Sequence, residues 1–190
     1  WSHRNTIINV LSNMGDTAAP ALAEWLNNDI PVNQTLSAIA LVGIGSDSIP
    51  TIEMAMQTQE LPSIAAVATL GHLGEKSVPV LIRYLGAELD DNIKETLAEA
   101  LANIGRPAIP PLLEILYNFN SQDFDQAVYD DALAALRTIG TDAVPFLIAL
   151  LNSDESYIRQ GVAETLGKIG ASSEVAIPHL LKLLQNEQNV

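Results

Sequence analysis

Carboxylate side chains are the residues of this chain whose types and spacing could most readily bind another molecule. They concentrate between residues 88 and 131, where only Lys94 and Arg106 are basic. The acidic residues of this segment are Glu88, Asp90, Asp91, Glu95, Glu99, Glu114, Asp123, Asp125, Asp130 and Asp131. Grouped carboxylates attract basic partners at long range. The alternative is a solvated helix face, because surface charge often serves solubility alone.

Aromatic side chains accompany these acids. Four of the nine aromatic residues of the chain lie close together in sequence: Tyr117, Phe119, Phe124 and Tyr129. Aromatic rings flanked by acids could hold a partner helix or the rings of a ligand. The structural alternative is that Phe119 and Phe124 fold back over the edge of their own structural unit, since aromatic residues are often buried.

Residues for catalysis or cofactor binding are scarce. The three histidines, His3, His72 and His179, are far apart, and the absence of cysteine excludes disulfides, thiolate metal sites and cysteine nucleophiles. The glycines do not cluster as phosphate-binding motifs require, and no serine lies in a nucleophile elbow. We therefore expect no catalytic residue, no cofactor, no metal and no enzymatic activity.

The net charge of −14 limits the kinds of partner. Nucleic acids and anionic membranes are bound through Lys and Arg, and this chain has only 9 of these against 23 acids. No apolar run approaches the length of a membrane span, and no signal peptide is visible. We expect a cytoplasmic protein that binds a basic or amphipathic protein partner, plausibly within a larger assembly. Simple solubility is the alternative explanation of the charge.

A six-residue phrase, Gly-x-x-x-x-Pro, recurs along the chain and indicates a repeat array. Its copies are Gly15–Pro20, Gly45–Pro50, Gly74–Pro79, Gly105–Pro110 and Gly140–Pro145, with a longer one at Gly170–Pro178. The glycines are 30, 29, 31, 35 and 30 residues apart. A period of this size with apolar residues in phase is typical of solenoids.

Each copy of the phrase predicts a corner between two helices. Small or apolar residues stand eight, four and one position before each glycine, as in Leu97, Leu101 and Ile104, with Ser37 the one polar member. Such steps share one helical face. Glycine ends that helix, and proline suits the first turn of the next, which has its own apolar pair such as Leu112 and Leu116. The expected N-caps are Asp16, Asp47 and Asp142.

We call the helix that begins near the proline the first helix of a repeat, and the helix that ends at the next glycine the second helix. The pattern predicts an all-α solenoid of about six short two-helix repeats, forming a single domain over residues 1–190. A second helix over 2–14 opens the array, and a first helix over 178–184 closes it. We therefore expect that the chain is an excerpt of a longer solenoid. Alternatively, Trp1 caps the first helix.

Residues 66–74 and 158–170 resemble HEAT repeats, and more narrowly the HEAT-like repeats of phycobilin lyase subunits. They read AVATLGHLG and IRQGVAETLGKIG. The likeness covers essentially the whole chain, although the arginine of the family pattern remains only at Arg4 and Arg159. Some HEAT-like proteins are DNA glycosylases, which the charge argues against. HEAT-repeat hydroxylases bind di-iron through His-Glu pairs, which this sequence lacks.

The resemblance implies that second helices line a concave surface. Glu95 and Asp130 both stand ten residues before a repeat glycine, so we expect them to lie near each other there. The expected acidic strip also contains Asp91, Glu99 and Asp131. Beside it, the 35-residue interval carries about five extra residues within the segment 117–125, which contains three of the aromatic residues. Insertions in solenoids are confined to loops and often lie at binding faces.

Two functions remain. The first is a non-catalytic interaction scaffold or adaptor that binds a protein on its concave face through Asp91, Glu95, Glu99, Tyr117, Phe119, Phe124, Tyr129, Asp130 and Asp131. The second, implied by the resemblance, is a chaperone-like phycobilin lyase or isomerase subunit that binds a tetrapyrrole. In that case Asp130 or Asp131 would pair with pyrrole N–H groups, and Tyr129 would stack on the rings. Because a repeat fold does not determine function, we favour the scaffold.

Overall fold

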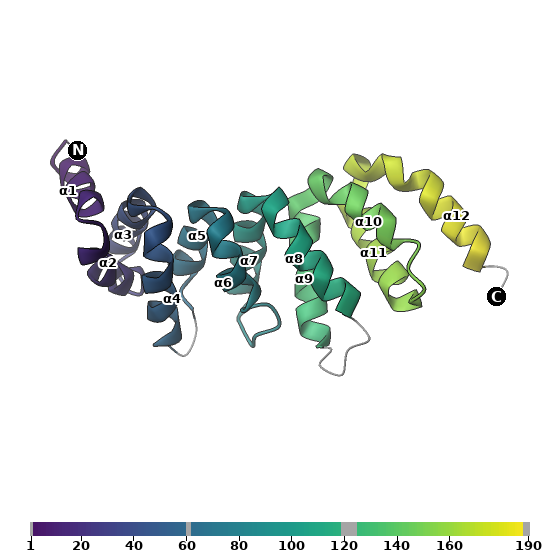
Figure 1. Cartoon of the computed structure of the whole chain (residues 1–190), viewed down its shortest axis with the longest axis horizontal. Coiled ribbons are helices and arrows are strands. Elements are labelled where there is room, and N and C mark those ends of the chain that lie inside the picture. Colours follow the sequence, from purple (N-terminus) through teal and green to yellow (C-terminus); the bar gives the residue numbers. More distant parts are fainter. Residues whose placement is uncertain (1, 60–61, 119–124, 188–190) are drawn as a thin grey trace. The chain divides into compact units, whose positions relative to one another are not determined.

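The computed structural model of the chain describes residues 2–59, 62–118 and 125–187, and these contain helices and no strand (Figure 1). Short 3₁₀ turns join the helices at the corners of the repeats. The α-helices are α1 (Ser2–Asn13), α2 (Ala19–Leu26), α3 (Pro31–Ile44), α4 (Ile49–Gln57), α5 (Ile64–Leu73), α6 (Val78–Ile82), α7 (Asp91–Ile104), α8 (Ile109–Tyr117), α9 (Gln126–Ile139), α10 (Val144–Leu150), α11 (Ser156–Ile169) and α12 (Ile177–Glu187).

The helices form two compact units. Unit 1 comprises Trp1–Tyr84 and Glu88–Ile104, and unit 2 comprises Leu85–Ala87 and Gly105–Val190. In unit 1 the second helices stack in the order α1, α3, α5, α7, and in unit 2 α9 stacks on α11. Each first helix from α2 to α10 packs on the second helix that follows it, as α2 does on α3. The predicted all-α solenoid of two-helix repeats is therefore confirmed. The single domain over residues 1–190 stays a prediction.

The repeat corners follow the glycine and proline phrase. All six repeat glycines, from Gly15 to Gly170, have a positive φ of 55° to 89°, a conformation that glycine adopts without steric cost. The expected aspartate caps are wrong, because no side chain of Asp16, Asp47 or Asp142 caps a helix. Each lies inside a 3₁₀ turn instead. At one such turn Ser48 Oγ donates to the carbonyls of Gly45 at 2.7 Å and Leu41 at 3.2 Å.

The core lies between the helices of each unit. The leucine four residues before each glycine from Gly45 onward is fully buried: Leu41, Leu70, Leu101, Leu136 and Leu166. Hydrogen bonds also join residues about one repeat apart. For example, Ser12 Oγ of α1 donates to the carbonyl of Ala40 on α3 at 3.1 Å. These contacts hold neighbouring repeats in register.

One helical run corrects the expectation that no apolar segment reaches the length of a membrane span. Residues Gln126–Leu150 qualify by length and composition, with a mean hydropathy of 1.5. The run contains α9, the corner at Gly140 with φ 73°, and α10, so it consists of two helices rather than one straight span. A second pair, Pro31–Ile44 and Ser46–Gln57, qualifies only when joined and is bent by 117°. That the protein does not bind membranes stays a prediction.

Candidate functional site

The exposed face of α7 carries a regular row of carboxylates, which we call the α7 row: Asp91, Glu95 and Glu99. Steps of four place all three on one side of the helix, and all three are exposed. The opposite side buries Ile93 and Leu97 in unit 1. Asp90 starts the helix, because its Oδ1 accepts a hydrogen bond from the backbone N–H of Ile93 at 2.9 Å.

The two predicted acids of α9 have different environments. Asp130 is exposed, and its Oδ1 accepts a hydrogen bond from Gln126 Nε2 at 2.9 Å. Asp131 is half-buried, and its Oδ2 accepts a hydrogen bond from the backbone N–H of Gly86 at 2.8 Å, within unit 2. Asp130 is therefore available to a partner, whereas Asp131 fixes the loop 85–87 against α9.

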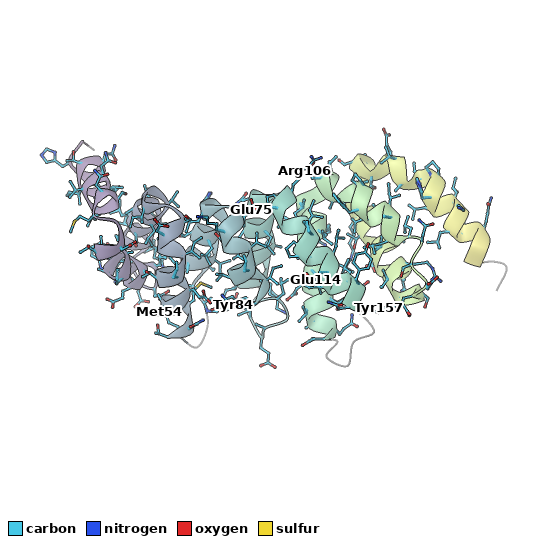
Figure 2. All side chains as sticks on the ribbon, viewed as in Figure 1. Met54, Glu75, Tyr84, Arg106, Glu114 and Tyr157 are labelled. Atoms are coloured by element: carbon cyan, nitrogen blue, oxygen red, sulfur yellow. The ribbon has the colours of Figure 1, made fainter. Side chains whose placement is uncertain are left out.

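Tyr129 lies in the core of unit 2 and not on its surface. The residue is only 1% exposed, and its ring centroid lies 4.8 Å from that of Tyr157 on α11, a residue labelled in Figure 2. A Cβ atom at Gly161 would stand 2.7 Å from the Tyr129 hydroxyl, so glycine is needed where α11 passes this ring. Burial raises the pKa of Tyr129. This placement assigns the ring to packing between α9 and α11.

The other three predicted aromatic residues are one exposed tyrosine and two phenylalanines that the structure does not describe. Tyr117 is exposed at the end of α8. Phe119 and Phe124 lie outside the described residues, so their partner-binding role stays a prediction. Of the predicted aromatic cluster, Tyr117 is thus the described member that is accessible to a partner.

The predicted acidic strip involves both units. The α7 row belongs to unit 1, and Asp130 and Asp131 belong to unit 2. That Glu95 and Asp130 lie near each other therefore stays a prediction. In the part of the chain that the structure describes, no group of three His, Cys, Asp or Glu residues could hold a metal ion.

A groove of about 200 Å³ runs between α9 and α11. Acids and bases both line it: Asp130, Arg137, Glu164 and Lys168. Lys168 Nζ lies 2.7 Å from Glu164 Oε1 and lowers the pKa of that carboxyl. Because opposite charges alternate in the groove, it offers no single sign of charge to a ligand.

A larger groove of about 490 Å³, which was not predicted from the sequence, lies between α2 and α4. The small side chains of Ala23 and Ala55 line the groove, and these two alanines are the feature of the sequence that could have indicated it. Asn27 Nδ2 donates to the carbonyl of Ala55 at 3.5 Å, while among the described residues its Oδ1 has no hydrogen-bond partner. Met54 stands exposed at the rim (Figure 2).

Comparison with known families agrees with the helical architecture. The family model for HEAT repeats matches residues 119–189, and that for the PBS lyase HEAT-like repeat matches residues 93–118. The chain is a HEAT-repeat protein with repeats that resemble those of phycobilin lyases. HEAT repeats commonly mediate protein interactions, and their presence supports a repeat scaffold.

Two further comparisons add little about function. No curated protein matches the sequence. The crystal structure of an engineered protein from the Northeast Structural Genomics Consortium is 21% identical over 82% of this chain and 81% of that chain, with a TM-score of 0.33. A TM-score this low supports no argument about fold or function.

Proposed function

We propose that this protein is a non-catalytic interaction scaffold that binds a basic or amphipathic protein segment through the second helix α7. The α7 row carries the proposal, because three exposed carboxylates share the side of the helix opposite its buried face. The net charge of −14 adds a long-range attraction for a basic partner.

The spacing of the α7 row defines the partner more closely. Four residues of an α-helix rise about 6 Å, so Asp91, Glu95 and Glu99 form a line of charges at that interval. A second helix lying alongside presents Lys or Arg at the same interval when these residues are also four apart. The partner segment is therefore a helix with basic residues at four-residue spacing.

The strength of such a contact is limited because the carboxylates are exposed. An exposed ion pair contributes about 0.2–1 kcal/mol, so three pairs contribute about 0.6–3 kcal/mol, and salt screens them. Charge alone thus gives a weak, salt-sensitive contact. Apolar side chains of an amphipathic partner would add affinity that does not depend on salt.

The test uses a fluorescently labelled helical peptide with lysines at four-residue spacing, titrated by anisotropy. Removing the row with D91N/E95Q/E99Q should weaken binding by about 3- to 150-fold, because those ion pairs are lost. The control, D16N/D47N/E75Q, removes the same charge from exposed residues at the repeat corners of unit 1. It should change the dissociation constant by less than about 2-fold. Equal weakening by both variants would show that net charge, and not the α7 row, attracts the peptide.

The tetrapyrrole-binding alternative gains no support from the site. Tyr129, expected to stack on the rings, is buried against Tyr157, and Asp131 already accepts the N–H of Gly86. Neither side chain is free to hold a chromophore as the resemblance implies. We therefore propose no enzymatic role.

A further inference from the structure

The second helix α3 carries an exposed apolar stripe on the side that corresponds to the α7 row. Val32, Ile39 and Val42 stand thirteen, six and three residues before Gly45, and they are 38–50% exposed. Steps of seven and three place them on one side of the helix. We call these three residues the α3 stripe. Ile39 and Glu99 both stand six residues before their repeat glycines, so the stripe and the row occupy the same side of their helices.

The α3 stripe has no counterpart in the other repeats. At six and three residues before the glycine, the five other second helices have only polar, charged or small residues. These pairs are Asn9 and Ser12, Ala68 and Gly71, Glu99 and Ala102, Ala134 and Arg137, and Glu164 and Gly167. The packing of a repeat therefore does not require large apolar side chains at these positions. Their exposure on α3 marks a surface that is available to a partner.

The α3 stripe and the α7 row belong to one face of unit 1. In this unit α3 packs on α5, and α5 packs on α7 (Figure 1). On the same side α5 contributes Ile64, which is 48% exposed, and the small Ala68. Neither α3 nor α5 contains Asp, Glu, Lys or Arg, so the carboxylates of these three helices are confined to α7. The face therefore changes from apolar on α3 to acidic on α7.

We propose that the basic helix bound by the α7 row lies along α5 and packs its apolar side against the α3 stripe. This inference rests on the proposed function and assigns the apolar half of the same contact. Axes of packed helices are about 8–10 Å apart, so the axes of α3 and α7 are about 16–20 Å apart. A helix about 10–12 Å across, lying over α5, has one flank toward each of them.

This arrangement defines the sequence of the partner. Successive residues of a helix are about 100° apart around its axis, so an apolar residue next to each basic residue faces α3 while the basic residue faces α7. The partner is therefore a helix with basic residues at four-residue spacing, each of them beside an apolar residue.

Two labelled helical peptides test this arrangement by fluorescence anisotropy. Both contain three lysines four residues apart, and each lysine is followed by leucine in the first peptide and by serine in the second. The wild-type chain should bind the leucine peptide about 10- to 100-fold more tightly, because burial of apolar surface adds affinity. High salt should weaken the binding of both peptides and leave this preference, since salt screens the charges alone.

The variant V32N/I39N/V42N removes the α3 stripe and leaves the α7 row unchanged. Asparagine and valine have similar helix propensities, so α3 should persist. This variant should bind the two peptides with dissociation constants within about 3-fold of each other. The control M54N/V175N replaces two exposed apolar residues on other elements and should keep the preference of the wild-type chain. Circular dichroism should show the same helix content for all variants.

The outcomes separate this inference from the proposed function. A preference for the leucine peptide that persists in V32N/I39N/V42N overturns the inference, and so does a wild-type chain that binds both peptides equally. In either case, weaker binding by D91N/E95Q/E99Q at low salt would leave the proposed function standing. If D91N/E95Q/E99Q binds both peptides as the wild-type chain does, the proposed function fails, and the inference fails with it.

Discussion

Replacing Gly71 with alanine tests how closely α5 and α7 pack in unit 1. A Cβ atom at Gly71 would lie 2.7 Å from the Cα and 2.8 Å from the Cβ of Ala100 on α7. Both distances are shorter than real Cβ contacts, and the obstacle includes backbone, which cannot rotate away. The two helices would have to separate.

The expected change in the free energy of unfolding for Gly71→Ala is the sum of two opposed effects. Overpacking a well-packed core costs about 1–3 kcal/mol. Alanine in a helix interior gains about 0.5–1 kcal/mol over glycine. The net destabilisation is therefore about 0–2.5 kcal/mol. For a chain of this length each kcal/mol lowers Tm by about 2–4 °C.

The matched control is Gly167→Ala on α11. An added Cβ there meets nothing within 4 Å, and Gly167 is exposed inside its helix. The control should therefore gain about 0.5–1 kcal/mol, which raises Tm. Thermal unfolding by circular dichroism compares the two variants, and hydrogen exchange shows whether α5 and α7 open first. If Gly71→Ala raises Tm as much as the control does, the close packing of α5 on α7 is wrong.

Three further predictions concern unit 2 and the tetrapyrrole. Because burial raises the pKa of Tyr129 above 10.0, the unfolded chain loses that proton first. The contribution of Tyr129 to the free energy of unfolding is therefore fully present below about pH 10 and declines above it. The variant Tyr129→Phe should lose less Tm than the wild type as the pH rises above 10. Equal loss of Tm in both proteins would contradict this prediction. Asp131→Ala should lower the free energy of unfolding by about 1–3 kcal/mol, because the N–H of Gly86 loses its partner. Asp130→Ala should lower it by less than about 0.5 kcal/mol. Unfolding in urea measures both variants, and equal destabilisation would refute the different roles of the two aspartates. Adding a free bilin should leave its absorbance and fluorescence unchanged, and a spectral shift would favour the lyase-subunit alternative.

The architecture could be predicted from the sequence because it depends on local rules that repeat. Gly45 and Pro50 each impose a backbone conformation on their own position, and the spacing of Leu97 and Leu101 alone puts them on the buried face. Repetition at a steady interval then turns a weak local signal into a strong one. The same helical spacing puts Asp91, Glu95 and Glu99 on one exposed side of α7, whereas the acidic strip that they were expected to form with Asp130 and Asp131 stays a prediction.

The contacts that the sequence did not predict join residues far apart in the chain. Tyr129 of α9 can be buried because Gly161 of α11 leaves space for its hydroxyl. No local sequence pattern links these two residues, which lie on different helices. Asp131 binds the backbone of Gly86, 45 residues earlier. The aspartate caps failed because each aspartate lies inside a 3₁₀ turn, so that Ala18, Ser48 and Ala143 occupy the N-cap positions instead.

Affinity capture from a cell lysate, at low and at high salt, tests the central claim that the α7 row binds a basic partner. The wild-type chain and the corner control D16N/D47N/E75Q should capture the same basic proteins at low salt and lose them at high salt, because salt screens exposed charges. The variant D91N/E95Q/E99Q should capture much less of them at low salt, where the other two proteins retain them. Equal capture by this variant and the control would contradict the claim.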